Sequence, residues 1–90
     1  MIKHLSIQVS GKVQGVFFRV SAKKEADQLG IKGSVRNEPD GSVYIEAEGE
    51  ENGLNEFAQW CKLGPEFAEV NRYHEKESEV KNFKTFEVLH

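Results

Sequence analysis

Residues 5–35 read LSIQVSGKVQGVFFRVSAKKEADQLGIKGSV, and the spacing of their apolar side chains changes twice. Apolar and polar residues alternate over Leu5–Val9, which is the period of a half-buried strand. Two glycines interrupt this pattern, and apolar residues then recur at helical spacing over Phe18–Leu29, where Gly30 signals the helix end. Alternation resumes over residues 31–35. The stretch therefore predicts a strand, a helix and a second strand.

The rest of the chain continues with two strands and a helix. Pro39-Asp40-Gly41 is a strong turn signal, and alternation over residues 43–49 predicts the strand that follows it. A second helix closes at Gly64–Pro65, a fourth strand opens at Ala68, and Phe83, Phe86 and Val88 predict a short C-terminal strand. The order predicts an α+β fold, a ferredoxin-like split β-α-β sandwich with two helices on one face of an antiparallel sheet.

Length and charge restrict the classes of function. Ninety residues form one domain, residues 1–90. The net charge of −3 argues against nucleic-acid and membrane partners, both of which need a basic surface. Bases nevertheless outnumber acids between residues 11 and 36, which suggests a local anion site, although chance placement of solvated charges is the alternative. The acidic run around Glu46 and Glu48 is interpreted as a solvated strand end and helix start.

Cys61 is the single cysteine, so the chain forms no intrachain disulfide and fits a reducing compartment. Its apolar helical surroundings predict a buried structural thiol. The chain begins in a strand without an apolar signal core, and no stretch reaches transmembrane length. We therefore expect a cytoplasmic protein, and a monomer.

The predicted topology brings two distant segments together. A right-handed crossover makes the first two strands parallel, so that their C-terminal ends lie at the same edge of the sheet. The third strand lies between them and separates these ends by roughly 10 Å, at about 4.8 Å per strand step. The loop after the first strand and Asn37 at the end of the second strand therefore face each other across a gap that suits a phosphate.

The loop Gly11–Arg19 has the residue types of an anion site. Its glycines allow positive φ and close backbone approach, and the following helix start adds unpaired N–H groups. The guanidinium of Arg19 matches two phosphate oxygens. Such a strand–helix turn is common, so a tight loop followed by a surface arginine is an open alternative. The spacing is not that of a nucleoside-triphosphate loop.

Two stretches carry a more specific signal. Val9–Arg19 closely resembles the first signature of the acylphosphatase family, and Gly33–Gly49 resembles the second. The likeness covers essentially the whole chain. One departure is Ser34, which stands where the family usually has an aromatic residue.

This resemblance implies an enzyme that hydrolyses the carboxyl–phosphate bond of small acyl phosphates to carboxylate and inorganic phosphate. It implies that Arg19 and Asn37 are catalytic, with Arg19 binding phosphate and Asn37 orienting the attacking water. It also implies that phosphate is bound, together with Arg19, by the backbone N–H groups of Gln14, Gly15, Val16, Phe17 and Phe18. No metal or cofactor is expected, and inorganic phosphate is expected to be both product and inhibitor.

Two non-catalytic roles of the same fold are the alternatives. RNA recognition needs exposed aromatics on central strands within a basic surface, which this acidic chain does not offer. A regulatory anion-binding domain is harder to exclude, and Asn37 is the residue that argues against it. His4, His74 and His90 lack the spacing of metal ligands.

Overall fold

The computed structural model describes residues 1–90 and confirms the α+β, ferredoxin-like fold. Its elements, in chain order, are β1 (Ile2–Lys12), α1 (Phe18–Leu29), β2 (Lys32–Asn37), β3 (Val43–Glu50), α2 (Glu51–Leu63), β4 (Glu69–Ser78) and β5 (Phe86–Val88). The predicted helix ends are correct, because Gly30 and Gly64, both with positive φ, close α1 and α2.

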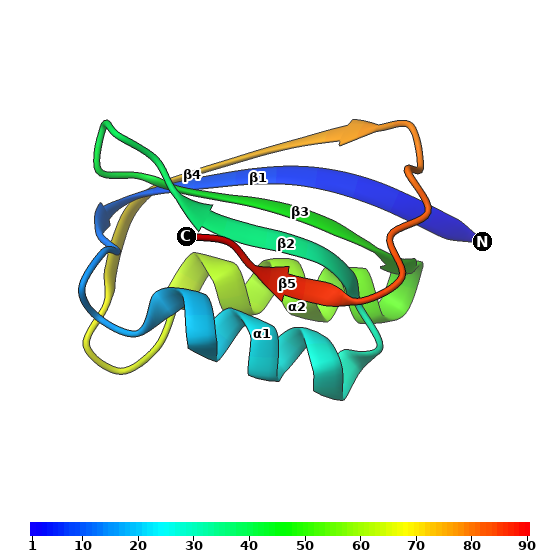
Figure 1. Ribbon diagram of the computed structural model, residues 1–90, viewed down its shortest axis with the longest axis horizontal. Coiled ribbons are helices and arrows are strands. Elements are labelled where there is room, and N and C mark those ends of the chain that lie inside the picture. The colour runs from blue at the N-terminus through cyan, green and yellow to red at the C-terminus, as the bar shows by residue number, and fades with distance from the viewer.

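The sheet has the strand order β4-β1-β3-β2-β5, and both helices cover one of its faces (Figure 1). β3 pairs antiparallel with β1 and with β2, so β1 and β2 run in the same direction on either side of it, as predicted. The short edge strand β5 pairs parallel with β2, which makes the sheet mixed. The C-terminal ends of β1, β2 and β5 therefore lie at the same edge.

The core fills the space between the sheet and the two helices. Its largest fully buried side chains include Phe18, Phe57 and Phe86. Cys61 is also fully buried, which confirms the predicted structural thiol, and burial raises the pKa of this thiol. Neither helix is long and apolar enough to cross a membrane.

The connection between β1 and α1 is shorter than predicted. Gly11 and Lys12 belong to β1 rather than to the loop, and they pair with β4 beyond a register shift at Ser10. Gly11 has a φ of 123°, and a Cβ there would collide with the backbone oxygen of Glu69. Glycine at this position therefore permits close strand contact, and the connecting loop comprises only residues 13–17.

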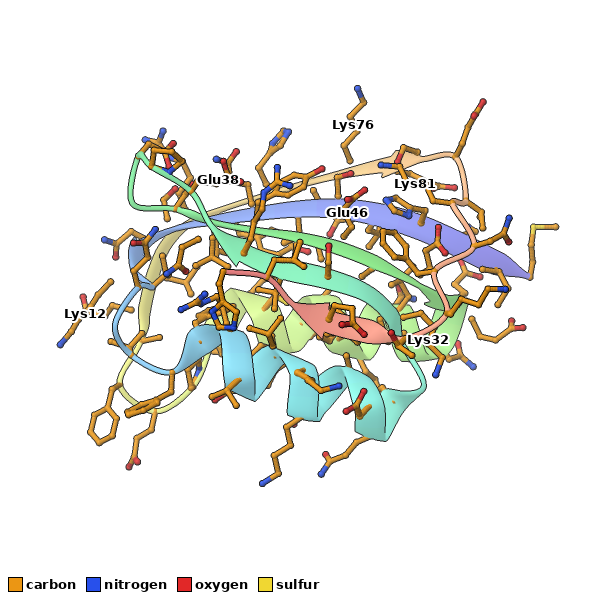
Figure 2. The ribbon with its side chains drawn as sticks, viewed as in Figure 1. Lys12, Lys32, Glu38, Glu46, Lys76 and Lys81 are labelled. Atoms are coloured by element: carbon orange, nitrogen blue, oxygen red, sulfur yellow. The ribbon has the colours of Figure 1, made fainter.

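The outer face of the sheet is not fully solvated. Glu48 is only 3% exposed, so the prediction of a solvated acidic strand end is wrong for this residue. The segment between β4 and β5 covers it: the N–H groups of Lys81 and Phe83 donate to its carboxylate, the second over 2.9 Å. His4 Nδ1 lies 2.8 Å from the same carboxylate and its ring stacks on Phe83, which lies outside β5 rather than within the predicted strand. Lys81 also pairs with Glu46 at 2.6 Å (Figure 2).

We expect Glu48 to make stability depend on pH. Burial alone would raise the pKa of Glu48, but the N–H groups of Lys81 and Phe83, together with His4, outweigh burial and hold the pKa below its ordinary value. The ionised carboxylate of Glu48 therefore stabilises the fold fully at pH values above the ordinary carboxyl pKa. This stabilisation is lost as the pH falls through the lowered pKa of Glu48 in the folded protein. Glu48→Gln, which keeps the size but turns an NH₂ group toward these donors, should lower the free energy of unfolding by about 2 kcal/mol at neutral pH.

Thermal unfolding of the parent, of Glu48→Gln and of the exposed control Glu56→Gln, each measured from neutral to acidic pH, checks this prediction. The acid sensitivity of the melting temperature should be smaller in Glu48→Gln and unchanged in Glu56→Gln. Equal acid sensitivity in all three proteins would contradict it.

Candidate active site

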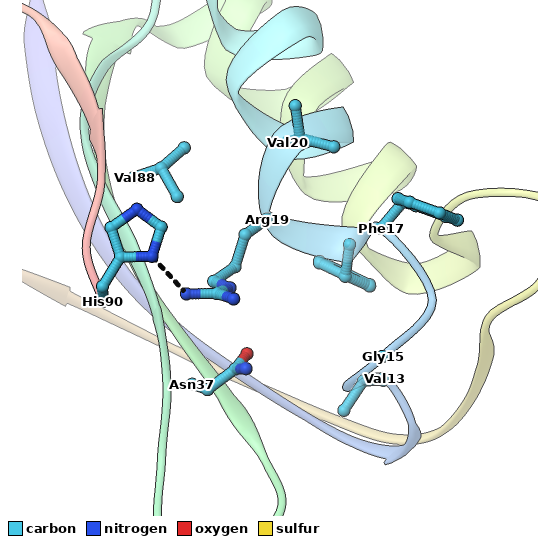
Figure 3. Close-up of a pocket in the computed structure, with 9 residues that line it drawn as sticks. Val13, Gly15, Phe17, Arg19, Val20, Asn37, Val88 and His90 are labelled. Atoms are coloured by element: carbon cyan, nitrogen blue, oxygen red, sulfur yellow. Dashed lines mark hydrogen bonds between the residues drawn. The ribbon is translucent and has the colours of Figure 1, made fainter.

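A cleft of about 340 Å³ opens where α1 begins and where β2 and β5 end (Figure 3). Its volume is at the lower end of the range for small-molecule sites, about 300–1,000 Å³. The residues that line it come from the β1–α1 connection, from α1, from the end of β2 and from the C-terminal segment. They are Val13, Gly15, Phe17, Phe18, Arg19, Val20, Asn37, Val88 and His90.

The loop 13–17 has a backbone suited to binding an anion. Gly15 and Phe17 have φ values of 74° and 65°, whereas Val16 between them has a negative φ. Such alternation turns successive N–H groups toward one side of the chain and creates an anion-binding concavity. Val13 and Val16 are buried in the core and anchor the loop. The conformation of Phe17 is costly for a residue other than glycine, by about 1 kcal/mol, and such positions cluster at functional sites.

The start of α1 adds to this positive field. Phe17 is the N-cap residue and offers no side-chain hydrogen bond to the first turn. The first turn also contains no acidic residue that would neutralise the helix dipole. The N–H groups of the first turn have no acceptor within the helix, so an anion in the cleft is their natural partner.

Arg19 is held in place by the C-terminal segment. Its Nη1 donates to the carbonyl oxygen of Leu89 over 2.9 Å and lies 3.3 Å from His90 Nδ1, the contact drawn in Figure 3. The N–H of Leu89 in turn donates to the carbonyl oxygen of Val35 in β2 over 2.8 Å, which fixes Leu89 against the sheet. The remaining guanidinium nitrogens, Nε and Nη2, have no partner within the chain and are free to contact two oxygens of a ligand.

Asn37 ends β2 on the helix-covered side of the sheet, and its side-chain amide makes no hydrogen bond within the chain. The turn that follows is stabilised by other residues. Asp40 accepts hydrogen bonds from the N–H and the hydroxyl of Ser42 over 2.9 and 2.6 Å, which lower the pKa of this carboxyl. Gln14 Nε2 donates to the carbonyl oxygens of Glu38 and Ser42, each over 2.9 Å. Asn37 therefore does not cap the turn, and its amide is free to face the cleft.

The structure brings together most of the residues that the sequence predicted for the site. Gly15, Phe17, Phe18, Arg19 and Asn37 all line the cleft. The side chains of Gln14 and Val16 do not: the first is bonded to the β2–β3 turn and the second is buried in the core. These two residues can face an anion only through their backbone N–H groups.

Sequence reasoning placed Val13 in the anion-binding loop without giving it a role, and it missed three lining residues, Val20, Val88 and His90. Val88 and His90 line the cleft because β5 pairs parallel with β2, so that the chain leaves β5 at the edge of the sheet where Asn37 lies. Ser34 pairs with Glu46 on the outer face of the sheet and is not part of the cleft wall.

The cleft offers positive charge and positioning rather than strong acids. No carboxylate or cysteine lines it, and Arg19 and His90 are its only side chains that can carry a positive charge. No group of three or more His, Cys, Asp or Glu side chains is placed to hold a metal ion. Such a site can neutralise an anion and orient a small nucleophile.

Comparison with known proteins agrees with this arrangement. The sequence model of the acylphosphatase family matches residues 5–88. An acylphosphatase of Archaeoglobus fulgidus is 49% identical over 86 residues, which cover 96% of this chain and 97% of that one. The crystal structure of acylphosphatase from Bacillus subtilis superposes with a TM-score of 0.94 at 37% identity and covers both chains fully. An acylphosphatase structure from Coxiella burnetii has the same TM-score at 36% identity, and covers 98% of this chain and 93% of its own.

Proposed function

Because this chain belongs to the acylphosphatase family and is an enzyme that hydrolyses acyl phosphates, we propose how its cleft performs that reaction without a metal ion. Arg19 and the N–H groups of residues 14–18 bind the phosphoryl group, and Asn37 orients the attacking water. One observation carries the proposal. The free donors of Arg19, the alternating backbone of the loop and the unbonded amide of Asn37 meet in one cleft.

The chemistry of the substrate suits these groups. The oxygen of water attacks phosphorus while the bond between phosphorus and the acyl oxygen breaks, and the bonding electrons leave with the carboxylate. The protons of the water pass to phosphate and solvent. Carboxylate is a good leaving group, so no strong acid is needed, and phosphoryl transfer depends mainly on positioning and on stabilising charge. The preorganised donors stabilise the phosphoryl oxygens, and Asn37 places the water in line with the breaking bond.

Hydrolysis of acetyl phosphate and benzoyl phosphate, before and after dialysis against a strong chelator, tests the proposal. We expect equal turnover in both preparations, because no cluster of metal ligands is present. Loss of activity that a divalent cation restores would contradict the metal-free mechanism. Phosphate binding without any turnover would favour a regulatory anion-binding domain instead.

Gly15 provides a test of the loop. Its φ of 74° disfavours any residue with a Cβ, although nothing lies within 4 Å of where that Cβ would stand. We expect Gly15→Ala to lower the free energy of unfolding by only about 1 kcal/mol and to weaken inhibition by inorganic phosphate. Gly15→Asn, whose side chain tolerates this conformation better, should retain more of the inhibition. Phosphate inhibition that is unchanged in Gly15→Ala would show that Gly15 is only a turn residue.

We further propose that residues 1–90 act as a single domain, as a monomer and in the cytoplasm. The single buried thiol supports a reducing compartment, since it needs no oxidised partner. Light scattering across a concentration series tests the monomeric state, and a mass that rises with concentration would contradict it.

A further inference from the structure

The cleft has an apolar side that the binding of phosphate does not use. Five of its nine lining residues are hydrophobic, and three of these, Phe17, Val20 and Val88, form what we call the apolar wall. Resting on the proposed function, we propose that the apolar wall binds the acyl group and that the enzyme prefers acyl phosphates with extended apolar acyl chains.

The exposure of these side chains supports a ligand-binding role. Phe17 is 71% exposed and Val20 is 59% exposed, although both belong to residue types that usually contribute to the core. The backbone of Phe17 is also in the left-handed region, and core packing does not explain this because the side chain lies outside the core. An apolar group placed against this wall would remove apolar surface from water.

In-line attack places the acyl group on this side of the cleft. The water and the leaving oxygen must stand on opposite sides of phosphorus, so a water held by Asn37 requires the acyl group to leave on the side away from Asn37. Figure 3 shows Asn37 on one side of the Arg19 guanidinium, and Val20 and Val88 on the other. An acyl chain that extends away from Asn37 therefore runs toward Val20 and Val88 (Figure 3).

The charge around the wall points to uncharged acyl groups. Arg19 and His90 are the only lining residues with titratable side chains, and Nη1 of Arg19 is within reach of His90 and of the carbonyl oxygen of Leu89. The apolar wall carries no cation. An acyl chain with a carboxylate of its own would therefore lose hydration there without gaining an ion pair. Acyl chains made of methylene groups fit this surface best.

A series of acetyl, butanoyl and hexanoyl phosphates tests the inference. Their carboxylate leaving groups are nearly equal in basicity, so differences in kcat/KM report mainly on contacts of the chain. Each methylene that is fully removed from water would raise kcat/KM about four-fold. Because the wall covers one side of the chain, we expect kcat/KM to be about 10-fold higher for hexanoyl than for acetyl phosphate.

Two variants locate this preference. Phe17→Ala removes the largest side chain of the apolar wall, and Val20→Thr replaces a methyl group with a hydroxyl group of similar size. Each should lower the ratio of kcat/KM for hexanoyl to acetyl phosphate at least about two-fold, and a general loss of activity cancels in this ratio. Phe67→Ala is the matched control, because Phe67 is 64% exposed but lies outside the cleft, and it should keep the parent ratio.

A parent ratio near unity would overturn the inference. A ratio of kcat/KM for hexanoyl to acetyl phosphate that is unchanged in Val20→Thr would also overturn it. The result for Val20→Thr is sufficient by itself if Phe17→Ala fails to fold. These results differ from a failure of the proposed function, in which none of the three substrates would be hydrolysed.

Discussion

An Arg19→Lys variant should fold normally and hydrolyse benzoyl phosphate on the order of 100-fold to 1,000-fold more slowly than the parent. Losses of this size follow the removal of one preorganised donor from a transition state. Lysine keeps the charge but loses the planar pair of donors, and in this cleft Nε and Nη2 are the guanidinium nitrogens left free for the phosphoryl oxygens.

Arg72→Lys is the matched control, because Arg72 lies on β4, outside the cleft, and makes no ion pair. This control should keep the turnover of the parent. Melting curves of both variants separate loss of the folded state from loss of chemistry. If a folded Arg19→Lys variant keeps near-normal turnover, the role proposed for the guanidinium is wrong.

Asn37→Ala should lower kcat about 100-fold or more while leaving inhibition by inorganic phosphate almost unchanged. A neutral amide is a poor base, so its contribution must come from orienting water, and misplacing a reactant costs about this much. The loss should appear in kcat because the contact is made mainly in the transition state. Stability should change little, since the amide makes no hydrogen bond within the chain and Gln14 and Asp40 stabilise the following turn.

Asn55→Ala on the exposed surface of α2 is the control for this substitution and should keep the kcat of the parent. Turnover, phosphate inhibition and the melting curve are best measured on one preparation of each protein. A variant of Asn37 that is less stable but keeps its turnover per folded molecule would show that Asn37 contributes to folding and does not orient the water.

Local signals in the sequence were sufficient to predict the main elements of the fold. Alternation marked the strands, and Gly30 and Gly64 marked the helix ends because they take positive φ there. Two features depended on contacts between distant segments. Gly11 looks like a loop residue but continues β1 beside Glu69, and Glu48 looks solvated but is covered by the segment that contains Lys81. Neither contact affects the spacing of apolar residues along the sequence, so neither could be predicted from that spacing.

The candidate site also contains residues that local signals predict and residues that depend on contacts between distant segments. Gly15, Arg19 and Asn37 could be predicted because strand order places Asn37 opposite the loop and because both stretches resemble the signatures of the family. Val88 and His90 could not, since their position depends on the direction in which a three-residue edge strand pairs. So short a strand carries too few residues to show which neighbour it pairs with.

The hydrogen bond from Arg19 to Leu89 joins positions 70 residues apart. A contact of such separation requires nearly the whole chain to be closed into a loop, and topologies rich in such contacts fold slowly. Trp60 packs against Phe18 with 5.3 Å between ring centroids, so its fluorescence follows formation of the core. Recovery of hydrolysis after dilution from denaturant instead follows completion of the cleft, which includes Val88 and His90. In this small enzyme the side chain of Arg19 acquires its hydrogen-bond partner Leu89 only when the C-terminal segment docks.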